Sequence, residues 1–532
     1  MKYRSTQFLI TILMAALFAG IPANACTSII VGREATQDGS VMNSQTADGW
    51  YDANLRIIPG AIHPDGTTMP VYFGLLGDEP LPPMVLGHIP QSAETYTYFR
   101  TAYSCFNEHQ LAIGESTIGQ KDELKTFPGE GGAILTIEQL MIIALQRCRT
   151  AKEAVLLIGN LAERYGFLGS CANDGESLSV TDPSEAWIME IMGTGFDWTP
   201  ESGPGAIWVA RKVPENHAAV LCNVSRIDIV DEENPDFLFS PGYKEPAIRH
   251  GWYDPASGEP FNWRKTYAPE TGPWSPSSMW VRGRLHYIHK HLMPSKKWDP
   301  YAETDSYPFS FAPEKLVSVR EIIEIFRSTM EGTPFSMEEN ATWYIPGENR
   351  NLLKSPKATP FPDRATRELL NIPYMRPIAA KTSYSFISQS RSWLPAPIGG
   401  ILWFSLDLPH FSTYIPLYAG TSKTPESWST FEKENFSLDS ARWTFLLVSS
   451  LANANYQRGI QTLKSLRDPL EEKNHRDFLD WETEGAAFAR RAEEIPREWF
   501  NQKAHEKMQE AHRIYVEIAH LLIREATIID LW

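Results

Sequence analysis

Cysteine is scarce in this chain, which has only 5 in 532 residues. No two of them form a Cys-x-x-Cys pair and no His-rich cluster accompanies them, so the pattern of a zinc site is absent. The sequence also lacks a Gly-x-Gly-x-x-Gly loop for a nucleotide and any internal repeat. We therefore expect neither a metal nor an organic cofactor. The cysteines are Cys26, Cys105, Cys148, Cys171 and Cys222.

Positive charge is in deficit. The chain has 49 Lys and Arg against 65 Asp and Glu, a net charge of -16. This balance argues against a broad surface for nucleic acid and favours a small-molecule or peptide partner. Hydrophobic residues make up 42% of the chain, enough for a globular core. After residue 25 no apolar run reaches the roughly 20 residues that span a bilayer, so we expect no transmembrane helix in the mature chain.

Residues 1–25 have the three parts of a secretory signal peptide. Lys2 and Arg4 precede an apolar run from Phe8 to Ile21, and Ala23-Asn24-Ala25 supplies a small-residue cleavage site. The run is too short for a permanent transmembrane anchor. The sequence therefore predicts an exported protein, periplasmic or extracellular, whose mature chain begins at Cys26.

A cysteine at the first mature position can carry out chemistry that an internal cysteine cannot. Its own α-amine has a reference pKa of roughly 7.7 to 8.0, so near neutral pH it can accept the thiol proton and activate the nucleophile. The alternative is a lipoprotein, in which the sulfur of Cys26 carries a lipid. Lipoprotein signals usually have a large aliphatic residue three positions before the cysteine, whereas this chain has Ala23. The other four cysteines form two disulfides or stay reduced, and the sequence leaves both open.

Strand and helix patterns alternate up to about Arg226, which predicts an α+β unit. Two helices are expected, at Ile137–Cys148 and Ala151–Tyr165. Strands are expected at Thr27–Gly32, Leu111–Gly114, Leu178–Thr181, Ala186–Met192, Ala206–Ala210 and Ala218–Cys222.

The second half begins with Pro-, Gly- and Trp-rich sequence, from Pro235 to about Pro313, which predicts loops and insertions. Ser318 with Glu321 forms a capping box that opens another helix. Later strands are expected at Ala379–Ser388, Gly400–Leu406 and Thr413–Ala419. We expect a catalytic domain over residues 26–437 and a helical C-terminal region over 438–532, where Met508, Ala511, Tyr515, Ile518 and Leu522 form an apolar stripe.

The segment from Cys26 to Met42, followed by Gln45-Thr46-Ala47-Asp48, resembles the opening of the dipeptidase A family of N-terminal nucleophile hydrolases. That family is related to the penicillin V acylases and bile salt hydrolases. Further blocks resemble the family in the same order, and the resemblance runs from Cys26 to roughly Arg458. These blocks begin at Asn107, Gly175, Glu185, Cys222, Tyr307, Glu331 and Arg391, the last of them running through Gly399.

The resemblance implies a fold and a set of site residues. The fold would be the four-layer αββα arrangement of these hydrolases, with two sheets packed between helices. Cys26 would be the nucleophile and Asp48 the carboxylate that holds its α-amine. Asn223 would stabilise the oxyanion with its amide, and Arg226 would orient the nucleophile. A second oxyanion donor would be a backbone NH near Ser116 and Thr117.

Gln45 is a departure, because many members of the family carry an Arg shortly before the Asp. A neutral Gln lowers the thiol pKa less than Arg does, so either Arg226 compensates or the pH optimum lies higher. Glu108, Glu115 and Glu176 are candidates to bind the free amine of a substrate, or are structural carboxylates.

The sequence thus predicts a cofactor-free dipeptidase that acts on small peptides through a thioester on Cys26. Two alternatives stay open: an N-acyl amidase like the penicillin V acylases, and a lipid-anchored binding protein without catalysis. The oligomeric state is left open, a homo-oligomer included.

Overall fold

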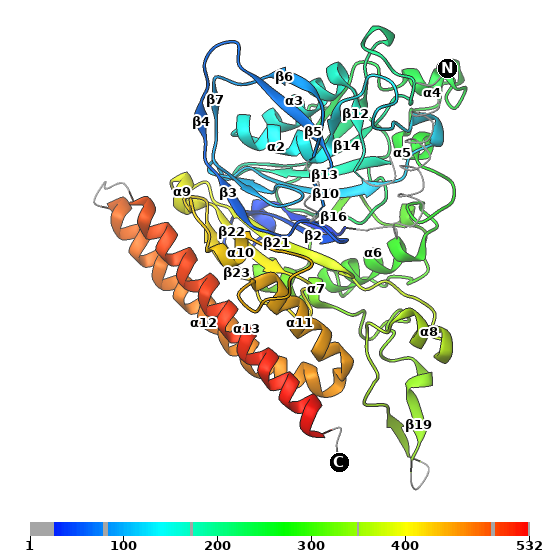
Figure 1. Ribbon diagram of the computed structural model, residues 1–532. Helices are drawn as coiled ribbons and strands as arrows, with labels where there is room; N and C mark the ends of the chain where they lie inside the picture. The colour runs from blue at the N-terminus through cyan, green and yellow to red at the C-terminus, as the bar shows by residue number, and fades with distance from the viewer. Residues whose placement is uncertain (1–25, 78–82, 171–173, 348–350, 491–494, 530–532) are drawn as a thin grey trace, which may run out of the picture.

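The computed structural model describes residues 26–77, 83–170, 174–347, 351–490 and 495–529. The predicted signal peptide, residues 1–25, lies outside the described residues, as does Cys171. Two antiparallel sheets form the centre of the molecule, and helices cover the outer face of each (Figure 1). Both α-helices and β-strands build this unit, as the α+β prediction required.

The first sheet holds the strand that follows Cys26. Its strand order is β18-β16-β1-β2-β21-β22-β23, so β1 lies between β16 and β2. The bounds are β1 Ser28–Val31, β2 Val41–Asp48, β16 Ala218–Leu221, β18 Ser310–Phe311, β21 Thr382–Ser390, β22 Ile401–Leu406 and β23 Ile415–Tyr418. Strands from both ends of the chain thus complete one sheet.

The second sheet packs against the first, in the order β17-β15-β14-β13-β10-β9-β8-β3. Asn43 of β2 joins the two sheets, because its side-chain amide donates to the carbonyls of Ala112 at 3.3 Å and Ser179 at 2.9 Å. The bounds are β3 Arg56–Ile58, β8 Tyr98–Arg100, β9 Phe106–Asn107, β10 Ala112–Ile118, β13 Gly175–Thr181, β14 Ala186–Met192, β15 Ile207–Val213 and β17 Phe237–Phe239.

Helices α2 (Ile137–Arg147) and α3 (Ala151–Tyr165) cover the second sheet. Thr150 and Glu153 form a capping box that begins α3, and Gly166 ends it at φ 74. A side chain at Gly166 would collide with Ala133, because a Cβ there would lie 2.5 Å from the Ala133 Cα. Both helices occur where the periodicity predicted them.

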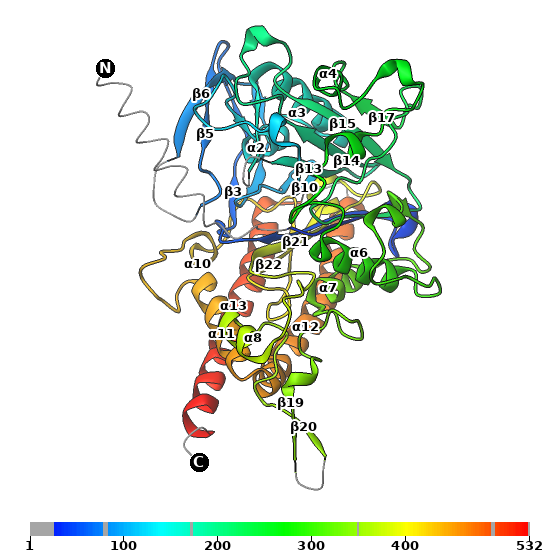
Figure 2. The same cartoon turned by 90° about the vertical axis from the view of Figure 1, so that its right-hand side faces the viewer.

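The first sheet is covered by α6 (Met279–Leu292), α7 (Val319–Arg327), α11 (Ala441–Ala454), α12 (Tyr456–Arg490) and α13 (Arg497–Ile529) (Figures 1 and 2). α7 begins with the predicted capping box of Ser318 and Glu321. The predicted apolar stripe of α13 is buried in the core, from Met508 to Leu522. Its role as core packing follows from that burial.

The remaining elements are short and lie around these layers. They are β4 Ala61–Ile62, β5 Thr68–Phe73, β6 Met84–Pro90, β7 Glu94–Thr95, β11 Leu135–Thr136, β12 Phe167–Leu168, β19 Tyr344–Pro346, β20 Leu352–Lys354, α4 Glu245–Arg249, α5 Trp263–Tyr267, α8 Arg364–Leu370, α9 Ala396–Gly399 and α10 Glu426–Ser429.

The prediction of loops over Pro235–Pro313 is wrong at α6. This helix buries Val281, Leu285, Ile288 and Leu292 against the first sheet, at a spacing of three and four residues. The stripe was present in the sequence, but Arg, His and Gly residues between its members obscured it. Among the described helices, none has an apolar stretch sufficient for a membrane crossing.

Candidate active site

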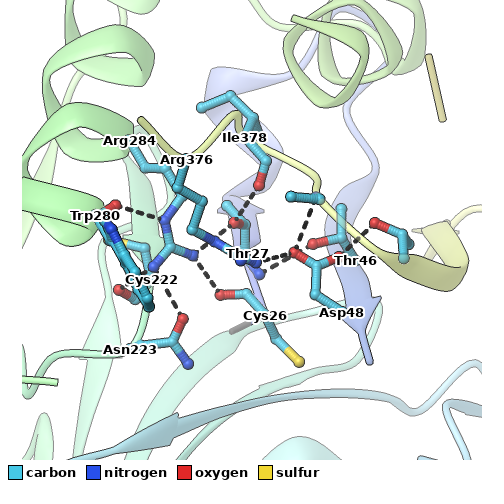
Figure 3. Close-up of polar contacts among 12 residues, drawn as sticks. Cys26, Thr27, Thr46, Asp48, Cys222, Asn223, Trp280, Arg284, Arg376 and Ile378 are labelled. Carbon is cyan, nitrogen blue, oxygen red and sulfur yellow. Dashed lines mark hydrogen bonds and ion pairs between the residues drawn. The ribbon is translucent and has the colours of Figure 1, made fainter. Parts of the chain in front are cut away.

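Three neighbouring strands bring Cys26, Asp48 and Asn223 to one edge of the first sheet. Cys26 directly precedes β1, Asp48 ends β2 and Asn223 follows β16 by two residues. Since β1 runs antiparallel to both neighbours, its start meets their ends. Figure 3 shows Cys26 between Asn223 and Asp48. The structure therefore brings together three of the residues that the sequence predicted.

Arg284 of α6 is the cation bonded to Cys26. Its Nη1 donates to the Cys26 carbonyl at 2.8 Å and to the Thr27 hydroxyl at 2.9 Å. Its Nη2 donates to Asn223 Oδ1 at 2.9 Å and to the Cys222 carbonyl at 3.0 Å (Figure 3). Burial, aided by the nearby Arg376, lowers the pKa of Arg284 to about 10, so it stays charged near neutral pH. One guanidinium thus fixes Cys26 relative to Asn223.

The structure puts Arg284 where the resemblance implied Arg226. The Arg226 guanidinium donates instead to the carbonyls of Thr304, Tyr307 and Pro308 at 3.3, 3.0 and 2.7 Å. Its backbone NH is held by the buried Glu190 carboxylate. Arg226 therefore ties the chain after Asn223 to the 304–308 loop, and the expectation that it orients Cys26 is corrected. Sequence reasoning missed Arg284 because it missed α6.

Asn223 is held in a left-handed backbone conformation, with φ 66. Asparagine is among the few residues that tolerate this region. Its backbone NH donates to Ser116 Oγ at 2.9 Å, and its side-chain amide donates to the Thr117 carbonyl at 2.9 Å. Ser116 Oγ also makes a long 3.5 Å contact with the Cys26 carbonyl. The predicted segment Ser116–Thr117 therefore lies at the site, contributed by β10 of the second sheet.

Asp48 is buried and pairs with Arg376, which precedes β21. It also accepts bonds from the Thr382 hydroxyl and, at 3.4 Å, from the Ala380 NH. Burial raises the pKa of Asp48, while Arg376, Thr382 and Arg284 oppose that rise. Breaking such a buried pair from one side generally costs about 3–5 kcal/mol. Arg376 gave no signal in the sequence, because it lies 328 residues from Asp48 in an irregular segment.

The segment before β21 also fixes the residue after the nucleophile. Thr27 Oγ1 donates to the Ile378 carbonyl at 2.9 Å, and the Thr27 NH donates to Thr46 Oγ1 at 3.1 Å. Cys26 itself is buried, with 2% of its surface exposed. The start of the predicted mature chain is therefore held by β2, by α6 and by the segment from Arg376 to Thr382.

Glu115 and Glu176 lie beside this site, whereas Glu108 does not. Glu115 precedes Ser116 on β10, and Glu176 pairs with Thr117 across β10 and β13. Glu108 precedes β10 at its other end, where its carboxylate accepts a bond from the Thr97 NH at 2.6 Å. The structure therefore supports Glu108 as a structural carboxylate and corrects its assignment to the substrate.

The remaining described cysteines, Cys105, Cys148 and Cys222, are buried and reduced. Among the described cysteines, Cys26, Cys105, Cys148 and Cys222, none is in a disulfide. Burial raises the pKa of Cys105, Cys148 and Cys222, which keeps those thiols protonated. Within the described part of the chain, no group of three or more His, Cys, Asp or Glu side chains could hold a metal ion.

The chain is similar to dipeptidases along most of its length. A probable dipeptidase of Latilactobacillus sakei is 23% identical over 452 residues, covering 82% of this chain and 82% of that protein. Dipeptidase A of Lactobacillus helveticus is 23% identical over 459 residues, covering 84% and 85%. A dipeptidase of Bifidobacterium longum is 22% identical over 488 residues, covering 85% and 81%. The sequence profile of peptidase family C69 matches residues 25–468. Since this match spans most of the chain, the protein belongs to peptidase family C69.

Proposed function

We propose that this protein is an exported dipeptidase whose mature chain begins with the nucleophile Cys26. The observation that carries the proposal is the double contact of Arg284, which binds both the Cys26 carbonyl and Asn223 Oδ1. It holds a thiol and an amide donor in a fixed relation at a sheet edge. Membership of a peptidase family and the similarity to dipeptidases supply the substrate class.

The chemistry follows from the position of Cys26. Once residues 1–25 are removed, its α-amine takes the thiol proton, and the thiolate attacks the peptide carbonyl carbon. The Asn223 amide donates to the oxyanion that forms there. The protonated amine, held by Asp48, then gives its proton to the leaving nitrogen, and the C–N bond breaks. Water hydrolyses the remaining thioester and restores the thiol.

The same proposal includes the fold and the organisation of the chain. Two facing sheets between helices are the architecture expected of N-terminal nucleophile hydrolases. Residues 26–437 would form the catalytic domain, and residues 438–532 a helical region that packs on β23 through α13. The proposed export rests on the three-part pattern of residues 1–25.

The experiment is a substrate panel with enzyme that begins at Cys26. We expect hydrolysis of dipeptides, loss of turnover in Cys26→Ala, and an acyl-enzyme of the expected mass when the reaction is quenched in acid. Faster hydrolysis of N-acyl amino acids than of any dipeptide would contradict the dipeptidase. An added mass of the size of a lipid on Cys26, in protein secreted with its own leader, would contradict the role of Cys26 as the nucleophile.

A further inference from the structure

A small cluster of acceptor oxygens lies next to the proposed nucleophile. Glu115 of β10, Glu176 of β13 and Gln45 of β2 are all fully buried. Gln45 Nε2 donates to Glu115 Oε2 at 3.3 Å, and the Thr117 hydroxyl donates to Glu115 Oε1 at 3.1 Å. The three side chains thus come from both sheets. Glu115 directly precedes Ser116, whose hydroxyl contacts the Cys26 carbonyl. We call Gln45, Glu115 and Glu176 the acceptor cluster.

The cluster has more acceptors than donors. Glu176 Oε1 accepts two bonds from Ser170, at 2.7 Å from its NH and 2.6 Å from its hydroxyl. Within the described residues, Glu176 Oε2 and Gln45 Oε1 have no hydrogen-bond partner although both atoms are buried. Buried polar atoms are normally paired, so each exception needs an explanation. Here two of them lie in one cluster, and one belongs to an amide rather than a carboxylate.

Glu176 lies beside a second carboxyl, that of Glu115. Across the described part of the chain, no Lys, Arg or His forms an ion pair with Glu176. Burial and the neighbouring Glu115 carboxyl, which is within hydrogen-bonding reach, raise the pKa of Glu176 well above its usual range. Two carboxyl groups within hydrogen-bonding reach of each other do not both ionise in an apolar site. The pair therefore favours a positively charged donor at this place.

We propose that the acceptor cluster is the binding site for a primary ammonium group, the free α-ammonium of the dipeptide substrate. An ammonium brings three N–H donors and one positive charge. Glu176 Oε2 and Gln45 Oε1 are acceptors that await donors, and the carboxyl pair supplies the opposite charge. The inference rests on the proposed function and deepens it, because it assigns the residues that select a free N-terminus.

The covalent geometry of a dipeptide agrees with this position. Its α-nitrogen lies about 2.5 Å from the carbonyl carbon that the thiol attacks, two bonds away. An ammonium site must therefore lie beside the nucleophile and the oxyanion donors. Glu115 and Glu176 meet this condition, since they flank Ser116 and Thr117, which contact Cys26 and Asn223. Glu108 does not meet it, because it lies before the far end of β10.

The experiment compares two substrates that differ only in the ammonium: alanyl-alanine and propionyl-alanine, in which hydrogen replaces the amine. We expect the enzyme to favour alanyl-alanine by at least about 100-fold in kcat/KM, as when a buried charge loses its partner. In Glu176→Gln, kcat/KM for alanyl-alanine should fall at least about 30-fold, while that for propionyl-alanine changes less than about 3-fold. Gln45→Leu should also lower the ratio of kcat/KM for alanyl-alanine to that for propionyl-alanine, by a smaller factor than Glu176→Gln does.

Glu138→Gln is the matched control. Glu138 of α2 is another buried carboxyl whose pKa burial raises to about 7, and its loss should leave the substrate preference unchanged. If kcat/KM fell equally for both substrates in Glu176→Gln and Gln45→Leu, the ammonium site would be overturned. The proposed dipeptidase activity would not be affected by that result. A wild-type enzyme that hydrolyses propionyl-alanine as fast as alanyl-alanine would overturn it without any variant. Absence of dipeptide hydrolysis in the wild type would instead overturn the proposed function.

Discussion

Arg284 links the carbonyl of Cys26 to the side chain of Asn223, so in the proposed mechanism it positions the nucleophile against the oxyanion donor. In Arg284→Lys a single ammonium cannot replace a planar guanidinium that donates to five oxygens. We expect kcat to fall about 100-fold, the scale of a small misplacement of reacting groups. Arg226→Lys disturbs the bonds to the carbonyls of the 304–308 loop. It should lower the melting temperature and leave kcat nearly unchanged. Similar losses of kcat in both variants would contradict the reassignment from Arg226 to Arg284.

Asn223 combines a strained backbone with a proposed catalytic amide, and two substitutions separate these roles. Asn223→Gly removes the amide but suits φ 66, whereas Asn223→Ala removes the amide and is strained there. Both should lower kcat roughly 10²- to 10³-fold with little change in KM, the loss expected of one oxyanion donor. Both variants lose the buried bonds to Arg284 and to the Thr117 carbonyl and should lower the melting temperature, and Asn223→Ala should lower it further because of the strain. A change confined to KM would mean that Asn223 binds the substrate instead.

We expect Asp48, which pairs with Arg376, to make activity depend on pH. The groups that face it are Arg376, Arg284, the Thr382 hydroxyl and the Ala380 NH. In the proposed mechanism its carboxylate must be ionised to hold the amine of Cys26, so we expect activity to be lost as pH falls through its pKa, which burial has raised. Arg376→Met removes the largest influence that lowers the pKa of Asp48. The acidic side of the pH profile of kcat/KM should therefore move to higher pH.

Arg56→Met is the control for that shift. Arg56 pairs with Asp52 at 2.7 Å in a more exposed position, and its loss should leave the acid limb in place. An acid limb that does not move in Arg376→Met would show that Asp48 is not the group that must be ionised.

At the scale of single elements, α7 offers a clean test of helix capping. The Ser318 side chain accepts a bond from the Glu321 NH and begins the helix. Ser318→Ala should lower the free energy of unfolding by about 1 kcal/mol without changing kcat, since α7 lies on the outer face of the sheet. Ser465→Ala, on an exposed part of α12, should change it by less than about 0.5 kcal/mol. Equal effects in chemical denaturation would contradict the cap.

The elements also show what sequence patterns can and cannot predict. Regular apolar spacing predicted α2, α3 and β14 closely. The sequence pattern did not predict β2, because the strand is largely polar although every residue in it is buried. Its polar residues are Asn43, Ser44, Gln45, Thr46 and Asp48. Its burial comes from the second sheet, which the local sequence does not reveal.

The site divides in the same way. Cys26, Asp48 and Asn223 could be found because they lie in short motifs at the ends of neighbouring strands. Arg284 and Arg376 could not, since each reaches the site from a segment far away in the chain. Glu115 and Glu176 were candidates by residue type alone, and the pairing of β10 with β13 is what separates them from Glu108.

At the scale of the whole molecule, the proposed catalyst is the first residue of the mature chain, Cys26. The most direct measurement compares two preparations, one beginning at Cys26 and one at Ala25, each verified by intact mass. In the longer chain the nitrogen of Cys26 is an amide and cannot accept the thiol proton. We predict that it unfolds at the same temperature as the shorter chain but hydrolyses no dipeptide, while the chain that begins at Cys26 is active. Equal activity in both preparations, with Ala25 still attached, would contradict the mechanism.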